Sequence, residues 1–172
     1  QWPSVLPYLS PFVDLGKVEY FSMLMQPRDL GKNMLLDQLS HMNSMLIKLI
    51  PNGEAKDINF KKEEDGETEV VFSYASGVSS CKVVYQFRYK ADNPREIDIA
   101  INQTKFKRKL GPNYEQKFVT EKGEVSVEDP FKVSIGMFVD AIQKNIPPLI
   151  SDEEIIQNMK LQDEIVNYYL IL

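Results

Sequence analysis

A run of β-type segments in the middle of the chain constrains the fold more than any other feature. Most of these segments are separated by short turns containing Ser-Gly, Asn-Pro or Gly-Pro, and short connections favour antiparallel neighbours. Ile97, Ile99 and Ile101 alternate with more polar positions, which predicts a sheet with one covered face. The five segments are rich in Val, Ile, Phe, Tyr and Thr: Glu69 to Ala75, Cys81 to Lys90, Arg95 to Asn102, Lys105 to Leu110 and Gln116 to Thr120.

Helical patterns flank this run on both sides. Residues 34–50 carry leucine and methionine at helical spacing and are followed by Pro51, which predicts a helix that ends there. Asp129 and Pro130 supply an N-cap and a first helical position for a second helix over residues 131–144. Ser151 and Glu154 form a capping box before a third helix that runs nearly to the end.

The N-terminal region adds one strand and one irregular segment. Prolines at positions 3, 7 and 11 predict that the first fifteen residues form no regular helix and that Trp2 anchors them by packing. Residues 18–25 are typical of a strand. The order of elements predicts an α+β fold: an open, predominantly antiparallel mixed β-sheet with helices packed on one face, in a single domain spanning residues 1–172.

Composition excludes several classes of function. A net charge of -5 argues against a general nucleic-acid-binding protein, which needs a basic surface. Cys81 is the single cysteine, so no intrachain disulfide can form, and we expect a reducing compartment, the cytoplasm. No apolar run approaches the roughly eighteen residues of a membrane span. The sequence begins with Gln1 and not Met, which indicates either processing or a piece of a longer protein.

Asp37 and His41 are the main candidates for chemistry. His41 is the only histidine, and residues four apart on a helix share one face, with Cβ atoms about 6 Å apart. One interpretation is a polar pair on the surface of an amphipathic helix. The other is acid/base work, in which the imidazole exchanges a proton with a hydroxyl group while the carboxylate orients it.

Motifs for cofactors and metals are missing. No two of the eight glycines are closer than eleven positions, so the chain contains neither a G-x-G-x-x-G fingerprint nor a P-loop, and we expect it to bind no dinucleotide by itself. His41 and Cys81 are forty positions apart and show no ligand spacing, so no metal site is predicted.

Two further patterns leave alternatives open. Lys105, Lys107 and Lys109 alternate along one strand, where lysines most often protect an exposed sheet edge and could otherwise hold an anionic group. An aromatic set shares one face of its strand and could pack either in the core or at a subunit contact: Tyr85, Phe87 and Tyr89.

Three stretches of the sequence resemble a known family. The run from Leu30 to His41, with the Pro51 to Glu54 helix stop, is similar to the start of the C-terminal domain of the glucose-fructose oxidoreductase/inositol dehydrogenase (Gfo/Idh/MocA) family. Residues 138–154 resemble the junction between that family's two closing helices, and residues 77–81 fit its middle. The resemblance covers nearly the whole chain.

The resemblance implies a function that the residues alone do not. It implies a C-terminal substrate-binding and oligomerisation domain of a longer oxidoreductase, whose N-terminal dinucleotide-binding domain is missing and would hold NAD or NADP. The family's catalytic positions match Asp37 and His41, which would contact the hydroxyl groups of a sugar, polyol or nucleotide sugar, with His41 as proton acceptor. Leu39 stands where the family often has a small residue, which predicts crowding of the substrate approach.

Assembly and activity also follow as expectations from the resemblance. The exposed sheet face would build a homo-oligomer, with Tyr85, Phe87 and Tyr89 as interface candidates, and no nucleic acid or membrane partner is expected. The fragment alone should be inactive. The alternative is a non-catalytic binding or oligomerisation module that keeps the fold and has lost the chemistry.

Overall fold

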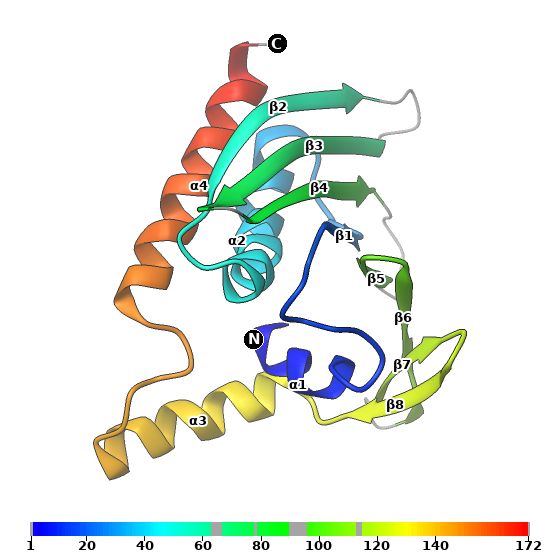
Figure 1. The fold of residues 1–172 in the computed structure, drawn as a ribbon, viewed down its shortest axis with the longest axis vertical. Coiled ribbons are helices and arrows are strands. Elements are labelled where there is room, and N and C mark those ends of the chain that lie inside the picture. The colour runs from blue at the N-terminus through cyan, green and yellow to red at the C-terminus, as the bar shows by residue number, and fades with distance from the viewer. Residues whose placement is uncertain (1, 63–66, 78, 90–95, 113–114, 172) are drawn as a thin grey trace.

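Eight strands of the described residues form one sheet in the order β2-β3-β4-β1-β5-β6-β7-β8 (Figure 1). The structure is a computed structural model that describes residues 2–171 apart from 63–66, 78, 90–95 and 113–114. The strands are β1 (Tyr20–Met25), β2 (Glu54–Lys62), β3 (Glu67–Ser76), β4 (Ser79–Arg88), β5 (Ile97–Ile101), β6 (Thr104–Leu110), β7 (Gln116–Thr120) and β8 (Gly123–Val127). β1 runs parallel to β4 and every other neighbouring pair is antiparallel, so the predicted open, mainly antiparallel mixed sheet is confirmed.

The helices lie on one side of this sheet, as predicted. They are η1 (Trp2–Val5), α1 (Leu6–Leu9), α2 (Gly31–Leu49), α3 (Pro130–Lys144) and α4 (Asp152–Ile171). α2 lies behind the sheet and α4 runs along it, whereas α3 extends away from the other helices (Figure 1). The strands predicted to reach Lys90 and to begin at Arg95 have those ends outside the described residues.

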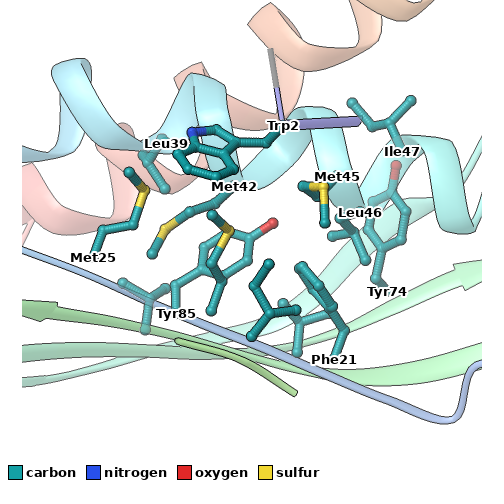
Figure 2. Close-up of a cluster of buried hydrophobic side chains, with 14 of the residues drawn as sticks. Trp2, Phe21, Met25, Leu39, Met42, Met45, Leu46, Ile47, Tyr74 and Tyr85 are labelled. Carbon is teal, nitrogen blue, oxygen red and sulfur yellow. The ribbon is translucent and has the colours of Figure 1, made fainter. Parts of the chain in front are cut away.

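The core lies between α2 and the covered face of the sheet. Figure 2 shows Trp2, the α2 side chains Leu39 and Met42, and the sheet side chains Phe21 and Tyr85 in one cluster. All five are at most 6% exposed, so Trp2 anchors the N-terminal segment as expected. Each fully buried side chain of this size contributes about 1.5–3 kcal/mol.

The N-terminal segment is more regular than its prolines predicted. η1 and α1 form two short helical pieces, and Pro7 lies in the first turn of α1. Proline is tolerated there because the first N–H groups of a helix have no intrahelical partner. The prediction that the first fifteen residues form no regular helix is therefore wrong for these short elements.

The two edge strands were not predicted from the sequence. In β2 the register with β3 shifts between Lys56 and Asn59, at Asp57, whose φ is 56°. Ala55 and Ile58 are both buried although they are three positions apart, so the strand shows no period of two. β8 is short and mostly exposed, and only Val127 in it is buried.

Two assignments left open by the sequence are now decided. Tyr85 and Phe87 are 0% and 1% exposed on the helix side of the sheet, so they are core residues and cannot serve as contacts of the outer face. Tyr89, 39% exposed, follows β4. The lysines at 105, 107 and 109 lie on β6, which is paired on both sides, so the prediction of edge protection is wrong.

The buried hydroxyl groups of Tyr74 and Tyr85 predict opposite responses to substitution by phenylalanine. Gln157 Nε2 donates to the Tyr74 hydroxyl at 2.7 Å, whereas the Tyr85 hydroxyl has no hydrogen-bond partner among the described residues. We expect Tyr74→Phe to lower the free energy of unfolding by about 1 kcal/mol and Tyr85→Phe to leave it unchanged or raise it. Urea denaturation followed by circular dichroism measures both, and a larger loss for Tyr85→Phe than for Tyr74→Phe would contradict the assignment.

Candidate functional site

The candidate site is built on α2, and α4 holds α2 in place. The two helices are antiparallel, and side-chain contacts join them at three places along their length. Lys48 Nζ binds Glu154 Oε1 at 2.6 Å, and Asn158 Nδ2 donates to the backbone oxygen of Ser40 at 2.8 Å. Further along, Gln162 Nε2 donates to the backbone oxygen of Leu36 at 3.3 Å. These contacts hold α2 against α4 along its length.

Asp37 and His41 lie together on the solvent side of α2, as the spacing predicted. Asp37 is exposed and His41 is half-buried. Gln38, only 6% exposed, donates from Nε2 to Asp37 Oδ2 and so restrains the carboxylate. Ser44 Oγ donates to the His41 backbone oxygen at 2.7 Å. The two candidate side chains are not hydrogen-bonded to each other in the described structure, and they interact through charge.

The environment of His41 favours the neutral imidazole. Burial lowers the pKa of His41 below its ordinary value of 6.5, and the negative charge of Asp37 acts in the opposite direction. A neutral imidazole can accept a proton, and the nearby carboxylate stabilises the imidazolium that then forms. The pair therefore has the chemistry of a general base with an electrostatic partner.

Leu39 does not crowd this surface. Its side chain is fully buried on the opposite side of α2, among the core residues. The expectation that Leu39 narrows the approach to the site is therefore wrong, because the side chain points toward the sheet. Asp37 and His41 remain open to a molecule that approaches α2 from the solvent side.

The large hollows of the described residues lie away from this pair. Two of them, of about 650 and 620 Å³, lie on the outer face of the sheet and at the end of α2, and neither is lined by Asp37 or His41. No described pocket next to the pair could hold a dinucleotide.

The carboxyl group of Asp98 is also perturbed, and it lies on a different part of the domain. Burial raises the pKa of Asp98, while the charge of Lys107 on the neighbouring strand acts in the opposite direction. Asp98 alternates with the buried Ile97 and Ile99, so it lies on the outer face of the sheet. It cannot reach a substrate held by His41.

Sequence reasoning missed the residues that position the pair. Gln38 is a polar residue inside the apolar stripe of the helix, and that misfit is the one signal that could have found it. Asn158 and Gln162 come from α4, and their role depends on tertiary contacts that spacing does not reveal.

Comparison with solved structures finds the same fold in two other proteins. The chain superimposes on a dehydrogenase (MviM) from Clostridium difficile with a TM-score of 0.61 and 12% identity, covering 97% of this chain and 59% of that one. It superimposes on a protein assigned as an oxidoreductase from Bacteroides fragilis with a TM-score of 0.57 and 14% identity, covering 98% and 58%. The expected fold is confirmed.

The comparisons also set the extent of the match. This chain spans about three-fifths of the length of the solved chains that it matches. Neither a protein-family model nor a curated protein matches the sequence. None of the described helices is long and apolar enough to cross a membrane.

The pKa of the single histidine provides a direct test of this site. Because the Asp37 charge raises the pKa of His41, Asp37→Asn should lower that pKa further. The imidazole resonances of the one histidine can be followed by NMR from pH 4 to 8 in both proteins. Asn33→Asp, which changes charge outside the pair, is the control, and an unchanged or higher pKa in Asp37→Asn would show that the two side chains do not interact.

Proposed function

We propose that this chain is the C-terminal domain of an NAD(P)-dependent oxidoreductase that acts on a hydroxyl group of a sugar, polyol or nucleotide sugar. The observation that carries the proposal is the Asp37 and His41 pair on an open helix surface, within a fold shared with a dehydrogenase and an oxidoreductase chain. In this proposal the domain binds substrate and supplies the proton acceptor.

Asp37 and His41 would have distinct roles. Oxidation of an alcohol removes a proton from oxygen and a hydride from carbon. The imidazole of His41, held neutral by burial, accepts the proton, and Asp37 orients the ring, stabilises its charged form and accepts a hydrogen bond from a neighbouring hydroxyl. The nicotinamide cofactor, bound by the rest of the protein, supplies the acceptor for the hydride.

In this proposal one part of the protein binds the cofactor and the described domain binds the substrate. The sequence offers no glycine-rich phosphate cradle, so the chain does not fit a dinucleotide by itself. The 172-residue chain alone is therefore expected to be inactive, and its contribution is limited to substrate hydroxyl groups and one proton.

Turnover of the longer protein tests the role of His41. We expect His41→Ala to lower kcat/KM by about 100- to 10,000-fold, because a positioned general base contributes that range. The assay follows NAD(P) reduction with a panel of sugars, polyols and nucleotide sugars, and Lys56→Ala, on the far edge strand, is the control. Cofactor binding without turnover of any substrate would favour the alternative, a non-catalytic binding or oligomerisation module.

We also propose that the protein forms a homo-oligomer through the outer face of the sheet. Helices cover only one face of the sheet. The other face carries a row of cross-strand partners with short or apolar side chains: Val71, Val84, Ser22 and Ala100. Such a row lets a second sheet approach closely, and an isologous contact buries the same patch on both subunits.

A charge placed in this row should prevent association. We expect Val71→Lys to convert the oligomer to a monomer, because two copies of the new ammonium group would be buried close together. Light scattering after size-exclusion chromatography measures the mass. Gln143→Lys adds the same charge on α3, away from the sheet, and equal masses for the two variants would show that the outer face is not the interface.

A further inference from the structure

The hollow of about 650 Å³ on the outer face of the sheet has the composition of a small-molecule site. Short or apolar side chains that face away from the core line part of it: Ser22, Leu24 and Ala100. Leu24 and Ala100 are each only 7% exposed, although neither belongs to the core cluster. Sites for small molecules have volumes of about 300–1,000 Å³ and combine apolar surface with a few convergent polar groups.

Asp98 brings an unsatisfied carboxylate oxygen to this hollow. Its Oδ1 atom is buried and has no hydrogen-bond partner among the described residues. Lys107 is its cross-strand partner on β6, but the two side chains form no ion pair in the part of the chain that the structure describes. Buried polar atoms without a partner are rare in folded proteins. Asp98 is therefore able to accept a hydrogen bond from a molecule in the hollow.

Lys105 and Lys107 bring positive charge to the same hollow. Both side chains line it and are exposed. They are two positions apart on β6, so they lie on one face with Cα atoms about 6–7 Å apart. Because β6 is paired on both sides, these lysines do not protect a sheet edge. The alternative that the sequence left open, an anionic group held by the lysines, gains support.

The arrangement of these groups indicates the chemistry of a ligand. In the register of β5 and β6, Asp98 is opposite Lys107 and Ala100 is opposite Lys105. A carboxylate and two ammonium groups thus lie around an apolar surface. Glu121 also lines the hollow, but it is exposed in the turn after β7, where solvent and salt screen its charge. A matching ligand carries an ammonium group, a carboxylate and an apolar group close together, and an α-amino acid has all three on one carbon atom.

We propose that this hollow binds an α-amino acid with an apolar side chain. The ammonium group of the ligand donates to Asp98, and its carboxylate binds Lys105 and Lys107. Its side chain contacts Leu24 and Ala100. The site goes beyond the proposed oxidoreductase function, because it lies on the sheet face that is turned away from α2.

Titration with leucine tests the site. Amide resonances of the isotope-labelled 172-residue chain are followed by NMR while leucine is added to millimolar concentration, and we expect the largest shifts at Asp98 and Lys107. Isocaproate is leucine without the ammonium group, and isoamylamine is leucine without the carboxylate. Each analogue should bind about 10- to 100-fold more weakly than leucine, because a hydrogen bond to a charged group contributes that range.

Substitutions test the assigned contacts. Asp98→Asn and Lys107→Met each remove one charge from the hollow, and each should weaken leucine binding by about 10- to 100-fold. Lys109→Met is the matched control, because it removes the same charge from the same strand but outside the lining. Circular dichroism checks that every variant is folded. Leucine binding that is equal in Asp98→Asn and in the unsubstituted chain would overturn the proposal, as would equal affinity for isocaproate.

A second protein separates this site from the other proposals. Ser22 and Ala100 also belong to the row proposed for self-association, so the titration is repeated with Val71→Lys. Binding by both proteins supports the site, and binding by Val71→Lys alone supports a site that a second copy competes for. Shifts confined to α2, or no binding by either protein, would overturn the site. Absence of binding would leave the proposed function standing, because Asp37 and His41 take no part in this hollow.

Discussion

The structure depends on the burial of the apolar side of α2 against the sheet. Leu35, Leu39, Met42 and Leu46 are all fully buried, and they cover the same sheet face that carries Tyr85. A sheet with one solvated face can be stable only if the other face is sealed, and α2 contributes more buried residues to that seal than any other described helix. The rotation of α2 about its own axis is therefore decided by the core and not by the candidate site.

That rotation is what brings Asp37 and His41 to the surface. With Leu39 turned toward the sheet, residues 37 and 41 must lie on the other side of the helix. The side-chain amides of Asn158 and Gln162 then bind backbone oxygens of α2 from the solvent-facing layer, which resists any turn of the helix. Packing and hydrogen bonding thus fix the positions of Asp37 and His41 before any ligand is present, which is the condition that the proposed acid/base chemistry would need.

The elements that could be predicted from the sequence are those whose side chains keep a regular period. α2, α4 and the central strands have such a period, and the helix spacing was enough to bring Asp37 and His41 together. β2 was missed because the bulge at Asp57 breaks its alternation. The core position of Tyr85 could not be predicted either. A period of two shows that Tyr85 shares one face of its strand with Phe87 and Tyr89, but it does not show which face of the sheet the helices cover.

The surfaces of the domain differ in how far their apolar side chains are covered by the rest of the chain. The side of the sheet under α2 is sealed, whereas the side chains of Phe138 and Ile142 on α3 are more than 60% exposed. η1 contacts both α2 and α3. Apolar burial therefore fixes the position of α2, whereas α3, in which only Pro130 is buried, is held mainly through its contact with η1.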